Sequence, residues 1–117
     1  MLKKIFCIIV VLAALVGNAS AAEVPIETYS SRVKCYVLTE TFINRTQYRD
    51  NRAFSVDVKF VGAATLVNNY SFRENDGLIW LSVNGEEDGV ANNDELAKRI
   101  WNFGLKYLGM DYEVRYD

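Results

Sequence analysis

The sequence predicts an α+β domain, in which a four-stranded antiparallel meander sheet is followed by one C-terminal amphipathic helix packed on one face. Residues 33–83 alternate largely between apolar and polar types with a period of two, which indicates strands. From Leu96 onward the apolar residues recur at helical spacing instead. Consecutive strands joined by short turns favour a meander, and one helix then covers one face of the sheet.

Four strands are expected, over residues 33–43, 53–61, 65–73 and 78–83. The second strand has the clearest alternation, and its apolar set is Phe54, Val56, Val58 and Phe60. Asp76 and Gly77 separate the third and fourth strands and favour a tight hairpin, because both residues tolerate positive φ. A short fifth strand over residues 112–116 is left open.

The helix is expected to follow residues 92–95, which offer an amide cap and acidic first-turn side chains that suit the positive end of the helix dipole. Its end is expected at Gly109, because glycine readily takes the left-handed conformation that closes a helix. Gly104 lies inside the apolar arc, where glycine costs about 1 kcal/mol relative to alanine. We therefore expect the helix to approach the sheet closely at Gly104.

Residues 1–21 have the three parts of a cleavable export signal. Lys3 and Lys4 give a positive start, residues 5–16 form an apolar run, and residues 19–21 give a small-residue cleavage pattern. The apolar run is shorter than the roughly 20 residues that span a bilayer, which disfavours a transmembrane anchor. The expected organisation is a signal peptide over 1–21, an irregular segment over 22–32 and a single globular domain over 33–117.

Cleavage would leave a secreted or periplasmic protein without a stable membrane span, and the short signal led by two lysines is typical of bacteria. Loss of Lys3 and Lys4 lowers the basic residues from 13 to 11 against 15 acidic ones, a net charge of −4. An acidic domain binds polyanions poorly, so nucleic acid is not expected as a partner. Cys35 would be the remaining cysteine, and we expect it in the core, with an interchain disulfide as the alternative.

Catalytic side chains are scarce, and we expect neither an enzyme nor a cofactor. The chain has no histidine, which removes the commonest general base and any Ser-His or Cys-His nucleophile pair. One mature cysteine also excludes a cysteine-rich metal site. A small hydrolase that uses paired carboxylates is left open as an alternative, since such pairs can carry out acid–base chemistry without histidine.

Residues 44–52 form a polar loop in which three arginines flank a tyrosine. Arginine offers a forked set of donors to carboxylate or phosphate groups, and tyrosine adds contact area at low entropic cost. Loops held by a rigid sheet often carry recognition. The candidate binding residues are therefore Arg45, Tyr48, Arg49 and Arg52.

Residues 84–95 resemble the loop of an EF-hand in the spacing of their oxygen donors. The candidate calcium ligands are Asn84, Glu86, Asp88, Asn92 and Glu95. The resemblance stops at this loop, because residues 78–83 before it read as a strand and not as an entering helix. A calcium-stabilised structural domain is thus an alternative, and an acidic loop that leads into a capped helix explains the same residues.

The expected function is that of a small exported, non-enzymatic binding module. Its partner would be an unknown protein or a component of the cell envelope. The strands carry large apolar side chains on both faces, whereas one helix can cover only one of them. An exposed sheet face could then also hold a second copy of the chain in a homo-oligomer.

Overall fold

The computed structural model describes residues 23–28 and 30–115, so the expected signal peptide and its cleavage point lie outside the described residues. The elements in chain order are β3 (Glu23–Ile26), β4 (Lys34–Asn44), β5 (Ala53–Val61), β6 (Thr65–Asn75), β7 (Leu78–Val83), β8 (Glu86–Val90), the 3₁₀ turn η2 (Ala91–Asn93) and helix α2 (Glu95–Tyr107).

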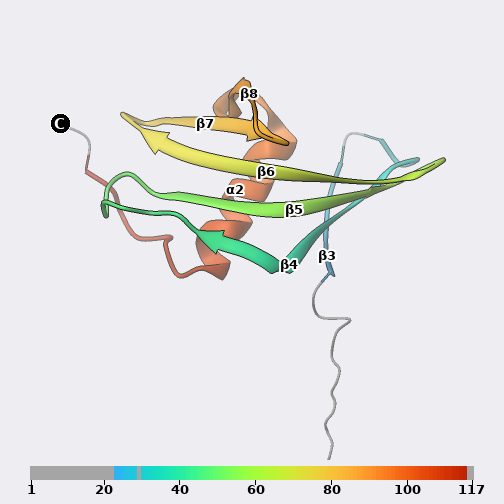
Figure 1. The fold of residues 1–117 in the computed structure, drawn as a ribbon, viewed down its shortest axis with the longest axis horizontal. Coiled ribbons are helices and arrows are strands. Elements are labelled where there is room, and N and C mark those ends of the chain that lie inside the picture. Colours follow the sequence, from blue (N-terminus) through green and yellow to red (C-terminus); the bar gives the residue numbers. More distant parts are fainter. Residues whose placement is uncertain (1–22, 29, 116–117) are drawn as a thin grey trace, which may run out of the picture.

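The strands form one antiparallel sheet in which each strand pairs with its neighbours in the chain, from β3 at one edge to β8 at the other. Helix α2 lies across one face of this sheet (Figure 1). The predicted α+β class, the antiparallel meander and the C-terminal helix are therefore confirmed. No helix in the described ranges is long and apolar enough to cross a membrane.

Within residues 23–28 and 30–115 the sheet has six strands, so the prediction of four is wrong in this detail. One extra strand, β3, lies within the segment expected to be irregular, and the other, β8, lies within the expected calcium loop. Residues 112–115 form no strand in the described chain, so the fifth strand left open there is not found. Pro25 is compatible with β3 because an edge strand tolerates a residue without a backbone N–H.

The β7–β8 strand pair results from a two-residue turn at Asn84 and Gly85. Both residues have positive φ, 53° and 85°, as do Asp76 and Gly77 in the preceding hairpin, at 52° and 78°. This conformation matches the right-handed twist of paired strands and favours Asn-Gly and Asp-Gly sequences. The acidic segment after Gly85 is thus directed back along β7 as a strand, although its composition is poor in typical strand residues.

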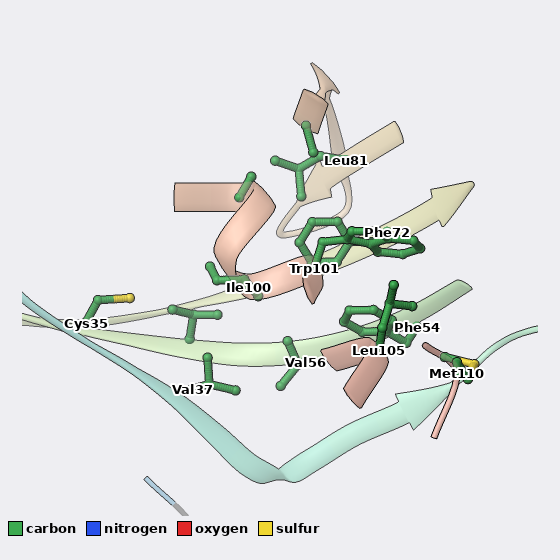
Figure 2. Close-up of a cluster of buried hydrophobic side chains, with 13 residues drawn as sticks. Cys35, Val37, Phe54, Val56, Phe72, Leu81, Ile100, Trp101, Leu105 and Met110 are labelled. Atoms are coloured by element: carbon green, nitrogen blue, oxygen red, sulfur yellow. The ribbon is translucent and has the colours of Figure 1, made fainter. Parts of the chain in front are cut away.

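The core lies between the helix and the sheet face beneath it (Figure 2). Phe54 of β5 is fully buried at its centre and stacks on Trp101 of α2, with ring centroids 5.3 Å apart. Phe72 of β6 packs beside both rings, at 5.1 Å from Phe54 and 5.7 Å from Trp101. These aromatic contacts fix the helix over β5 and β6 and leave the opposite face of the sheet without a helix among the described elements.

The helix approaches the sheet closely at Gly104, as predicted. A Cβ atom added at Gly104 would overlap the Phe54 ring, at 2.6 Å from Cε1 and 2.9 Å from Cε2. The N-terminal cap differs from the expected amide, because the side chain of Asp94 accepts a hydrogen bond from Ala97 N. At the other end Gly109 has φ 71° and closes the helix as predicted.

Cys35 lies in the core, 2% exposed, as the simpler of its two interpretations predicts. Burial raises the pKa of its thiol from 9.0 to about 11, because the thiolate loses solvation in an apolar environment. A protonated, enclosed thiol is a poor nucleophile, so a disulfide between chains would require this part of the domain to open.

Candidate functional site

The sheet face opposite the helix carries two cross-strand rows of side chains near the β4–β5 loop. Alternation places Arg73 and Trp80 on this face, because their neighbours Phe72 and Leu81 point into the core. In the first row, Arg45 is joined to Ala53 by a backbone hydrogen bond of 2.8 Å, Ala53 pairs with Arg73, and Arg73 pairs with Trp80.

The second row runs parallel to the first, two residues further along each strand. It consists of Ser55, Ser71, Ser82 and Glu87, each paired with the next. Three small hydroxyl side chains therefore lie side by side on β5, β6 and β7. Neighbouring strands are roughly 5 Å apart, so the hydroxyl-bearing residues follow one another at that spacing.

A groove of about 590 Å³ runs along these two rows, and all their residues except the buried Ser55 line it. The small side chains of Ala53, Ser71 and Ser82 make its floor, whereas long side chains from the first row and from the β4–β5 loop make its walls. Tyr48 stands at the rim and is 70% exposed. A volume of this size lies within the range of roughly 300–1,000 Å³ that ligand sites in proteins occupy.

Most polar groups in the groove have no partner within the part of the chain that the structure describes. Arg45 donates from Nε to Ser55 Oγ at 3.1 Å, which holds its side chain over the floor but uses neither Nη group. The guanidinium of Arg73, the hydroxyls of Ser71 and Ser82 and the indole N–H of Trp80 make no hydrogen bond or ion pair there. These groups are therefore directed at solvent and can bond to a ligand.

The groove is positively charged within an otherwise acidic domain. Arg45 and Arg73 contribute two cations, and Glu87 contributes one anion at the far end. Glu74 also borders the groove, but its carboxylate is neutralised by Arg52 at 2.7 Å. Low-dielectric walls around a cleft focus the field of such charges, so the groove attracts anions.

The buried pair of Arg52 and Glu74 anchors the β4–β5 loop beside the groove. Arg52 donates from Nε and Nη2 to the two carboxylate oxygens of Glu74, at 2.8 and 2.7 Å. Its Nη1 donates to the carbonyl oxygens of Met110 and Tyr112, at 2.7 and 3.2 Å. The segment after α2 is thereby tied to the loop, and the two lie side by side in the ribbon (Figure 1).

The four arginine-loop residues predicted as binding residues have three different environments. Arg45 and Tyr48 line the groove. Arg49 lies outside it, with its guanidinium 4.1 Å from the ring centroid of Tyr112. Arg52 is buried and bonded to Glu74, so we leave it out of the candidate site together with Arg49.

Arg73, Trp80 and the serine row were not identified as site residues from the sequence. The signal that could have found Trp80 is its phase in the alternation, opposite to that of Leu81, which places a large aromatic side chain away from the core. Its position beside Arg73 depends on strand register, which the sequence leaves undetermined.

The residues of the expected calcium loop are distributed over a hairpin and a helix. Asn84 occupies the turn and accepts a hydrogen bond from Asn69 N at 2.8 Å, and Asn92 accepts one from Ile79 N at 2.8 Å. Glu86 and Asp88 belong to β8, and Glu95 begins α2. The described residues contain no group of three or more His, Cys, Asp or Glu side chains placed to hold a metal ion. The hairpin turn and these backbone contacts account for the two asparagines without an ion.

Comparisons with protein-family models, with curated proteins and with solved structures find no match for this chain. The candidate site therefore stands on its own geometry.

Proposed function

We propose that this chain is a small exported, non-enzymatic binding module, and that its ligand binds in the groove on the face of the sheet opposite α2. The observation that carries the proposal is one cross-strand row that holds Arg73, Trp80 and the two Nη groups of Arg45, none of which has a partner among the described residues. Because the sheet orders their backbone, only side-chain rotamers remain to be fixed when a ligand binds.

The composition of the groove supports binding to a partner. Trp, Tyr and Arg are the residue types most enriched among the side chains that dominate binding energy at interfaces. In the groove they surround a floor of serine hydroxyls, which supplies polar contacts for orientation. The one carboxylate here without a cation is Glu87, so this surface offers no pair of free carboxylates for the hydrolase alternative.

Export is the second part of the proposal, and its support is the pattern of residues 1–21. Expression of the full chain in a bacterium, with intact-mass analysis of the periplasmic and medium fractions, tests it. We expect a product that begins at Ala22. A product that stays in the cytoplasm with its first 21 residues would contradict export but would leave the groove untouched.

Site-specific photo-crosslinking in the native envelope tests the binding role. A photoreactive amino acid replaces Gln47 at the rim of the groove, and a matched control replaces Lys98, an exposed residue of α2 on the other side of the sheet. We expect a discrete adduct from position 47 and none from position 98. Adducts of equal yield from both positions, or from position 98 alone, would contradict a ligand site in the groove.

A further inference from the structure

We infer that the groove binds an acidic peptide segment of a protein partner, with a carboxylate held between Arg45 and Arg73 and an adjacent apolar side chain placed on Trp80. This inference rests on the proposed function, because it names the class of ligand for the same site.

The spacing of the two arginines fits a single carboxylate between them. Arg45 and Arg73 are separated by Ala53 alone in the cross-strand row, so their Cα atoms lie two strand spacings, roughly 10 Å, apart. The methyl group of Ala53 leaves the space above it open. Two guanidinium groups can therefore reach an anion there from both sides, and each can donate a pair of parallel hydrogen bonds.

Trp80 determines which kind of ligand group binds next to that carboxylate. It pairs directly with Arg73, is half-buried and lines the groove. An indole face binds apolar side chains well and loses little conformational freedom in doing so. A ligand that reaches both Arg73 and Trp80 must therefore present an acidic and an apolar group one or two residues apart.

The remaining polar groups fit a peptide backbone. The carboxylate of Glu87 can accept hydrogen bonds from the N–H groups of a peptide backbone. The hydroxyls of Ser71 and Ser82 can donate hydrogen bonds to its carbonyl oxygens. Glu87 also opposes a ligand of high negative charge, such as a phosphorylated chain, because the groove has only one positive charge in excess. A peptide with a few carboxylates and free backbone N–H groups satisfies all these groups at once.

The test is selection of displayed random dodecapeptides against the folded domain, followed by measurement of the selected peptides by fluorescence anisotropy. We expect selected sequences in which Asp or Glu lies one or two residues from a large apolar residue. Their affinity should fall roughly tenfold or more in Arg45→Met and in Arg73→Met, because each change removes a charge-assisted hydrogen bond. It should also fall as salt is raised.

Matched variants separate the groove from general charge. Arg49→Met makes the same change in net charge outside the groove and should leave affinity unchanged. Trp80→Ala should lower affinity roughly thirtyfold, whereas Tyr107→Ala, on an exposed aromatic of α2, should not. Retained urea midpoints show that each variant is folded.

Two results of the peptide selection and affinity measurements would overturn the inference. One is selection of neutral or basic peptides, or of none. The other is an affinity that Arg49→Met reduces as much as Arg45→Met does. A galacturonate tetramer, which carries carboxylates on sugar rings, is the competing ligand class. If the tetramer displaces no bound peptide, the inference is supported. If the tetramer binds the groove more tightly than any selected peptide does, the inference is contradicted. An adduct from position 47 with a non-peptide partner would contradict the peptide but preserve the binding role.

Discussion

Replacement of Arg52 by methionine should destabilise the domain more than any other single change to a charged side chain in the described chain. The side chains of Arg52 and Glu74 are 8% and 2% exposed, and they share two hydrogen bonds under 3 Å. Arg52→Met leaves the Glu74 carboxylate buried without its cation and removes the donor to Met110 O. Loss of one member of a buried pair costs about 3–5 kcal/mol, a large share of the roughly 5–15 kcal/mol that stabilises a domain of this size.

Urea unfolding of residues 22–117, followed by tryptophan fluorescence, measures this cost. With a slope of about 2 kcal/mol per molar urea, the midpoint should fall by about 2 M. Arg49→Met is the control, because the side chain of Arg49 is 65% exposed and its ion pair with Asp50 is 3.5 Å long. Such a pair contributes less than about 1 kcal/mol.

The double variant Arg52→Met/Glu74→Leu keeps the test decisive even if Arg52→Met does not fold. Removal of both charges leaves no uncompensated carboxylate, so the double variant should be more stable than Arg52→Met alone. The reasoning is refuted if Arg52→Met costs no more than Arg49→Met, or if the double variant is as unstable as the single one.

Three further outcomes are expected. Gly104→Ala should lower the free energy of unfolding by about 1–2 kcal/mol, because overlap with Phe54 outweighs the helix propensity of alanine; a more stable variant by urea titration would contradict the close approach. Asp94→Ala should cost about 1 kcal/mol through loss of the cap to Ala97 N, whereas Asp94→Asn should retain most of it; equal losses would argue against the cap. The unfolded chain releases the Cys35 proton near pH 9.0 while the folded chain holds it to about pH 11, so this thiol's contribution to stability is complete below pH 9 and is lost by about pH 11. Comparison with Cys35→Val isolates this contribution. Between pH 9 and pH 11 the free energy of unfolding of the native chain should fall by roughly 2–3 kcal/mol more than that of the variant, and parallel curves of unfolding free energy against pH would contradict the burial.

The elements with strong patterns could be predicted from the sequence, and the elements without them could not. The alternation of Phe54, Val56 and Val58 made β5 recognisable, and the helical arc with Gly104 made α2 recognisable together with its close approach to the sheet. β8 was missed because Glu86 and its neighbours have low strand propensity. The Asn-Gly turn before it determines its course, and that dipeptide was interpreted as the start of a calcium loop.

The candidate site was only partly predictable, because its residues meet through strand register. Loop composition named Arg45 and Tyr48 as binding residues, and both line the groove. It could not distinguish Arg45 from Arg52, which has the same chemistry and the opposite burial. Arg73 and Trp80 lie on separate strands, and only the observed pairing places them beside Ala53. Local sequence determines which face a strand residue takes, whereas the partner across the sheet depends on turns and pairing.

Backbone amide chemical shifts, recorded before and after addition of the crosslinked partner or a selected peptide, locate the binding surface most directly. If the ligand occupies the groove, the largest changes fall on the two cross-strand rows, at Ala53, Ser71, Arg73, Trp80 and Ser82. Changes concentrated on the exposed side of α2, with those rows unmoved, would contradict the proposed binding surface.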